Sequence, residues 1–133
     1  MSVMVSKIIH VSIQRPWKEV YAFASDPVRM PDWAGGLANG LTQDGEEWIA
    51  TGPLGAARVA FAPRNEYGVI DHVVTLPDGS QVFNALRVMP NGDGAEIAFT
   101  LLKQSQMSEA DFERDAAAVL SDLTVLKDML ERR

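Results

Sequence analysis

The clearest structural signal lies near the C-terminus, in residues 108–130, which read SEADFERDAAAVLSDLTVLKDML. Apolar side chains recur three or four positions apart in this segment, as they do along the buried face of an α-helix. The members of this stripe are Phe112, Ala116, Val119, Leu120, Leu123, Leu126 and Leu130. Ser108 followed by Asp111 is typical of a capping box at the start of a helix. The segment therefore predicts a long helix whose apolar face packs against the rest of the chain.

Short β-strands are predicted before this helix. Residues 7–13 alternate in the manner of a half-buried strand. Turn signals then follow at short intervals, at Asp44-Gly45, Gly52-Pro53-Leu54-Gly55, residues 63–66, Pro77-Asp78-Gly79 and Pro90-Asn91-Gly92. Because sequential strands joined by tight turns pair with their neighbours, the segments between these turns predict an antiparallel meander.

Two short helices are predicted between the first two strands. Pro16 suits the first turn of one, and Asp26-Pro27 forms an N-cap and first position for the other. The complete pattern predicts an α+β helix-grip fold, in which a curved antiparallel sheet of about seven strands wraps around the long C-terminal helix. No linker or repeat divides the 133 residues, so we expect a single domain over residues 1–133.

The predicted turns also align the strands with one another. Centring each hairpin on its turn residues pairs Arg58 with Asp71, Asp71 with Arg87, and Arg87 with Glu96. Opposite charges directly across strands are favourable, so this row predicts the solvent-exposed, convex face of the sheet. The alternate side chains must then point inward. That inner set is almost wholly apolar and comprises Leu41, Trp48, Val59, Phe61, Ile70, His72, Val74, Val82, Asn84, Leu86, Val88, Ile97, Phe99 and Leu101.

Two polar residues, His72 and Asn84, lie on this apolar face, one diagonal step apart on adjacent strands. A buried polar group without a partner costs about 1–3 kcal/mol, so they either satisfy each other or face a cavity. Ligand sites are mostly apolar with a few convergent polar groups, which favours the cavity. We expect Trp33 to seal the fold or to gate the cavity mouth. The predicted ligand-binding residues are Trp33, Trp48, Val59, Phe61, Ile70, His72, Asn84, Leu86, Phe99, Val119 and Leu123.

Several local motifs match a known group of proteins. They are residues 20–27 (VYAFASDP), 31–34 (PDWA), 68–72 (GVIDH), 77–79 (PDG) and 87–92 (RVMPNG). In this order, the chain resembles small bacterial members of the SRPBCC superfamily, the group of START, Bet v 1 and polyketide cyclase-like proteins. The resemblance implies a deep hydrophobic cavity. It does not imply one reaction, because such proteins bind lipids and hormones, cyclise polyketides or bind other proteins. Oxygenase members hold iron with two histidines and a carboxylate, whereas His10 and His72 lie here on separate predicted strands.

Composition excludes several classes of function. The net charge of −6 and the lack of a basic stripe argue against a nucleic-acid partner. The chain has no cysteine, which fits a cytoplasmic location, and it has no predicted signal peptide or membrane-inserted segment. With two histidines and no thiolate we expect no metal site, and no phosphate-binding loop indicates a cofactor.

Three functions remain open. The first is binding of a hydrophobic or aromatic small molecule, including a lipid, in the cavity. The second is a polyketide cyclase- or dehydrase-like enzyme in which His72 is the general base and Asn84 orients a carbonyl. The third is a protein-interaction module, which would require an exposed apolar patch that the sequence does not reveal. A homodimer through a sheet edge or the helix is compatible with each.

Overall fold

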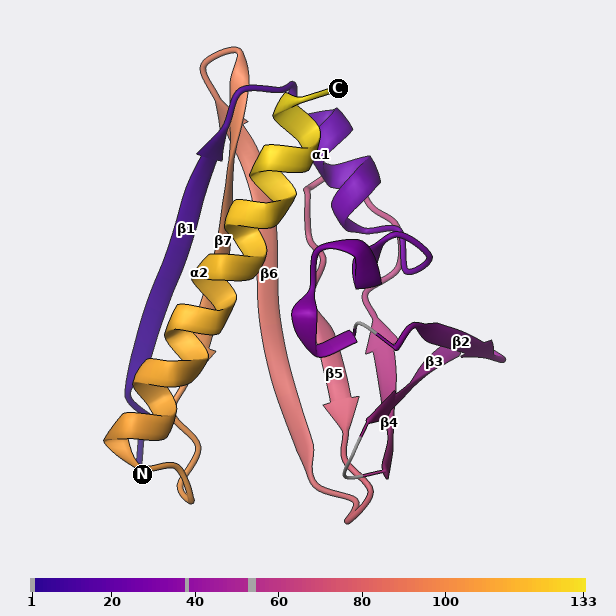
Figure 1. Ribbon diagram of the computed structural model, residues 1–133, viewed down its shortest axis with the longest axis vertical. Helices are drawn as coiled ribbons and strands as arrows, with labels where there is room; N and C mark the ends of the chain where they lie inside the picture. Colours follow the sequence, from indigo (N-terminus) through magenta and orange to yellow (C-terminus); the bar gives the residue numbers. More distant parts are fainter. Residues whose placement is uncertain (1, 38, 53–54) are drawn as a thin grey trace.

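The computed structural model describes residues 2–37, 39–52 and 55–133. Its seven strands form one antiparallel sheet in the order β1-β7-β6-β5-β4-β3-β2. The elements are β1 (Ser6–Ile13), α1 (Trp17–Ala24), the 3-10 turns η1 (Met30–Asp32) and η2 (Gly35–Leu37), β2 (Leu41–Asp44), β3 (Glu47–Gly52), β4 (Gly55–Phe61), β5 (His72–Thr75), β6 (Gln81–Asn91), β7 (Gly94–Leu102) and α2 (Glu109–Glu131). The predicted α+β helix-grip arrangement is confirmed (Figure 1).

The long helix α2 lies along β1 and β7, and α1, η1 and η2 lie beside it over the remaining strands (Figure 1). Its start is the predicted capping box, because the Asp111 N–H donates to Ser108 Oγ at 3.0 Å and the Ser108 N–H donates to the Asp111 carboxylate at 3.3 Å. The buried face comprises Phe112, Ala116, Leu123, Leu126 and Leu130. Leu120 was wrongly placed in this stripe, since it is 47% exposed and lies at the edge of the buried face, beside β1. None of the described helices is long and apolar enough to cross a membrane.

The predicted row of charges across four strands is wrong in its register. Arg58 lies opposite Thr75, four positions beyond the predicted partner Asp71. The cause is the connection between β4 and β5, which runs from Phe61 to His72 and is longer than a turn centred on residues 63–66. Arg58 instead binds two carboxylates of the β2–β3 hairpin, Asp44 and Glu47, each at 2.7 Å.

The β6–β7 hairpin shows a smaller shift of the same kind. Asn91 pairs with Gly94, so the turn is centred one residue later than predicted and Arg87 faces Ala98 instead of Glu96. Glu96 accepts a hydrogen bond from the imidazole of His10 at 2.7 Å. Because both shifts are by an even number of residues, the faces of the strands are unchanged. The prediction of the inner, apolar face therefore holds, although the predicted pairings of Arg58 with Asp71 and of Arg87 with Glu96 do not. The side chains of the third predicted pair, Asp71 and Arg87, do form an ion pair, at 2.8 Å.

The core forms where this inner face meets the helices. Its most deeply buried large side chains are Ile13, Val20, Val88, Ile97, Leu123, Leu126 and Leu130. The predicted turn at residues 52–55 lies partly outside the described residues, although Gly52 and Gly55 at its ends are paired.

Candidate functional site

A cavity of about 280 Å³ lies between the inner face of the sheet, the η1–η2 segment and α2. It is lined by Met30, Trp33, Ala34, Gly36, Leu37, Val59, Phe61, His72, Val74, Asn84, Leu86, Phe99, Val119, Asp122 and Leu123. The lining is mostly apolar. It includes three side chains with hydrogen-bonding or ionisable groups, each from a different element: His72 of β5, Asn84 of β6 and Asp122 of α2.

Nine of the eleven predicted ligand-binding residues are among those that line this cavity. The two that do not are Trp48 and Ile70. Trp48 is half-buried on β3, one strand beyond Val59, its partner across the ladder. Ile70 is buried in the core and precedes β5, because the β4–β5 connection enters the sheet only at His72.

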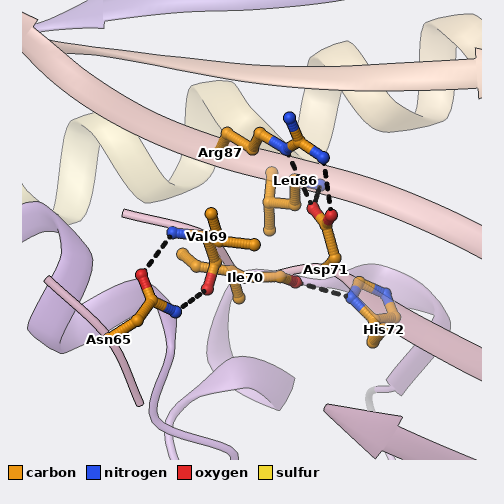
Figure 2. Close-up of polar contacts among 7 residues, drawn as sticks. All are labelled: Asn65, Val69, Ile70, Asp71, His72, Leu86 and Arg87. Carbon is orange, nitrogen blue, oxygen red and sulfur yellow. Dashed lines mark hydrogen bonds and ion pairs between the residues drawn. The ribbon is translucent and has the colours of Figure 1, made fainter. Parts of the chain in front are cut away.

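His72 is held in one orientation. Its Nδ1 lies 3.0 Å from the carbonyl oxygen of Ile70, as Figure 2 shows. A carbonyl oxygen can only accept, so Nδ1 carries the proton and Nε2 keeps its lone pair. Burial lowers the pKa of His72, which keeps the ring neutral near pH 7. The ring also packs against Phe61, with the two centroids 5.3 Å apart.

The segment that leads into His72 is fixed by side-chain hydrogen bonds (Figure 2). Asn65 donates to the carbonyl oxygen of Val69 at 2.9 Å and accepts from its N–H at 3.1 Å, closing the loop on itself. Asp71 binds the Arg87 guanidinium at 2.8 Å and accepts from the N–H of Leu86 at 3.0 Å. These contacts tie the loop to β6, so the backbone on both sides of Ile70 is restrained.

Asn84 lies directly opposite His72 in the β5–β6 ladder, and not one diagonal step away. Neither side chain satisfies the other, since the one hydrogen bond of the imidazole goes to Ile70. The Asn84 amide has no hydrogen-bond partner among the residues that the structure describes. It therefore presents both a donor and an acceptor at the cavity wall.

Asp122 is a cavity residue that the sequence analysis missed. One of its oxygens accepts a hydrogen bond from the N–H of Gly35 at 3.2 Å, which joins α2 to η2. Burial raises the pKa of Asp122, and the hydrogen bond from Gly35 only partly offsets that effect. The signal was present in the sequence, because Asp122 follows Val119 by three positions and precedes Leu126 by four. A carboxylate at this spacing interrupts the apolar stripe.

Trp33 belongs to the cavity wall. Its side chain is 6% exposed and packs within the core cluster, so the same residue lines the cavity and contributes to the core. Its indole Nε1–H is buried without an acceptor in the described part of the chain.

Metal ligands are not assembled here. Within residues 2–37, 39–52 and 55–133, no group of three or more His, Asp or Glu side chains is placed to hold a metal ion.

Several solved structures share this fold. XoxI from Bacillus cereus has a TM-score of 0.75 and 11% identity over 95% of each chain. DynU16, a protein of the dynemicin biosynthetic locus, has a TM-score of 0.71 and 16% identity, covering 95% of this chain and 47% of that one. The Aha1 dimer from Colwellia psychrerythraea has a TM-score of 0.73 and 13% identity over 96% and 97% of the two chains.

The sequence itself matches no protein-family profile and no curated protein. At the identities of the solved structures, the similarity shows a common fold and nothing about ligand or reaction.

Proposed function

We propose that the protein is a member of the SRPBCC superfamily that binds a small, largely apolar or aromatic molecule between the sheet and α2. One observation carries the proposal: a mostly apolar cavity has His72, Asn84 and Asp122 together in its lining. A hydrophobic site with a few polar groups is the usual composition of a ligand pocket, in which the apolar surface supplies affinity and the polar groups set orientation.

The size of the cavity limits the ligand. A volume of about 280 Å³ lies just below the range of roughly 300–1,000 Å³ that small-molecule pockets span. One or two fused aromatic rings, or a short acyl chain, match this space better than a complete phospholipid.

The test is a calorimetric titration with 2-naphthol, a rigid, neutral aromatic probe. We expect Val119→Phe to weaken binding at least about tenfold, because the larger side chain would occupy part of the cavity volume that the probe needs. Val125→Phe is the matched control, because Val125 is 40% exposed on the same helix and does not line the cavity. Equal affinity of both variants and the wild type would contradict the proposal.

A second candidate function is cyclase- or dehydrase-like catalysis at His72. The observation in its favour is the fixed tautomer, which leaves Nε2 as a neutral base that could remove a proton next to a substrate carbonyl. Asn84 on the facing strand could donate a hydrogen bond to that carbonyl oxygen.

The catalytic hypothesis separates from simple binding through His72→Gln. The glutamine keeps a polar group at the cavity wall but provides no base near pH 7. Loss of turnover on a linear poly-β-ketone with retained affinity would support catalysis, whereas unchanged turnover would exclude His72 as the base.

Self-association is a further proposal for the outer face of the sheet. Ile8 of β1 and Phe83 and Met89 of β6 are exposed apolar side chains there, and the sequence analysis did not identify them. A protein of the same fold, Aha1 from Colwellia psychrerythraea, is described as a dimer. Light scattering of the wild type and of Phe83→Asp tests this proposal, and a monomeric wild type would contradict it.

A further inference from the structure

The polar groups of the cavity are unevenly divided between donors and acceptors. Asp122 presents a carboxylate and His72 a lone pair on Nε2, while Asn84 presents one acceptor and one donor group. The buried Nε1–H of Trp33, which also belongs to the cavity lining, is a further donor without a partner in the described part of the chain, but it carries no charge. No lysine or arginine is among the residues that line the cavity. A ligand carboxylate, phosphate or sulfonate would therefore enter without a cationic partner, which is unfavourable in an apolar space.

Asp122 itself has no counter-ion in the part of the chain that the structure describes. No Lys, Arg or His nitrogen of these residues lies within ion-pair distance of its carboxylate, and its one hydrogen-bond donor is the backbone N–H of Gly35. Asp122 is partly buried at the cavity wall, and an ionised carboxylate that gives up part of its hydration without a partner is destabilised. Its remaining lone pairs are free to accept hydrogen bonds from a bound molecule.

The surrounding walls also suit a cation. Phe61, Phe99 and Trp33 line the same cavity, and the faces of aromatic rings attract ammonium groups. The overall charge of −6 further favours the approach of a positively charged molecule.

We propose that the ligand of this cavity is a small cationic amine with an apolar or aromatic body, and that its ammonium group pairs with Asp122. This inference rests on the proposed binding function and adds the chemical class of the ligand. The amine supplies the counter-ion that the protein does not, and the apolar body covers the inner face of the sheet.

The experiment compares three probes that share one skeleton, 2-phenylethylamine, 2-phenylethanol and phenylacetate. Their dissociation constants are measured by calorimetry at about pH 8, where the amine is cationic and carboxyl groups are ionised. A charge-assisted hydrogen bond is strong enough that we expect the amine to bind at least about tenfold more tightly than phenylacetate. The alcohol, which can donate a hydrogen bond but carries no charge, should lie between them.

Two variants of α2 locate the effect. Asp122→Asn keeps the acceptor for Gly35 but removes the charge, so the amine should lose about tenfold in affinity and the alcohol should change less than about twofold. Asp128→Asn removes the same charge from an exposed position of the same helix and should change neither affinity. Circular dichroism and the melting temperature of each variant establish that it is folded.

The outcomes distinguish this inference from the proposed function. Tightest binding of the amine, lost in Asp122→Asn alone, supports the inference. Tightest binding of the alcohol or of phenylacetate by the wild type overturns it while leaving the cavity a binding site, and so does an equal loss in Asp128→Asn. If none of the three probes binds the folded wild type, both proposals are overturned.

Discussion

Gly68 offers the sharpest test of how the chain positions its candidate site. It lies in the β4–β5 connection with a φ of +76°, and the three residues that follow it lead directly to His72. A Cβ at this position would overlap the carbonyl oxygen of Val88 in β6. The Gly68 carbonyl also accepts the N–H of Val88 at 2.9 Å, so the loop and β6 are in direct backbone contact.

The effect of Gly68→Ala can be estimated from these contacts. An L-residue in the left-handed region costs about 1 kcal/mol. Relief of the overlap must shift backbone on both sides, because neither contacting group is a flexible side-chain end, and this shift disrupts a hydrogen bond that contributes about 1 kcal/mol. With the packing lost around Val88, we expect the free energy of unfolding to fall by about 3 kcal/mol.

Gly79→Ala is the matched control. Gly79 also has a positive φ, +89°, but no atom lies within 4 Å of a Cβ built on it. We expect this variant to lose only the conformational part, about 1 kcal/mol. Urea denaturation measures both variants, and unchanged m-values would show that the folded and unfolded states remain comparable. Equal losses in the two variants would refute the argument from close approach.

Three further predictions concern α2 and the cavity. Leu126→Ala should lower the free energy of unfolding by about 2–5 kcal/mol in urea titrations, whereas Leu120→Ala, at a side chain that is 47% exposed, should lower it by less than about 1 kcal/mol. Asp122→Asn should raise the melting temperature at pH 7. The pKa of Asp122 is raised in the folded state, so its ionisation at pH 7 opposes folding, and the neutral amide removes that cost. The gain should disappear below about pH 4, where this carboxyl group is protonated in the unfolded chain as well. We expect the wild type to lose stability below about pH 6.5, because the lowered pKa of His72 in the folded state makes its protonation oppose folding. His72→Leu should reduce this loss, as measured by melting temperature against pH.

The order of elements and the inner face of the sheet could be predicted from the sequence because both depend on local periodicity. The alternation in β4, β6 and β7 places Val59, Leu86 and Phe99 correctly. The apolar stripe and the capping box at Ser108 likewise give α2 and its start. The register between strands could not be predicted as well from the sequence. The β4–β5 connection folds back through Asn65 and Gly68, and nothing in its local pattern gives its length.

The polar residues of the site were also predicted only in part. His72 and Asn84 could be identified as polar residues on an apolar strand face, but their direct opposition depends on a register that the turns did not define. Asp122 was overlooked because its helix was judged by its apolar members alone. The contacts of Asp122 come from η2, a short turn whose position over the sheet no periodicity predicts.

The central claim is that the cavity binds a small molecule, and methyl NMR tests it most directly. Titration of the wild type with 2-naphthol should shift the methyl resonances of Val59, Val74 and Leu123, which line the cavity from two strands and α2. The resonance of Val125, exposed on the same helix, should stay in place. Shifts confined to exposed methyl groups, or no shifts at saturating probe, would contradict the account.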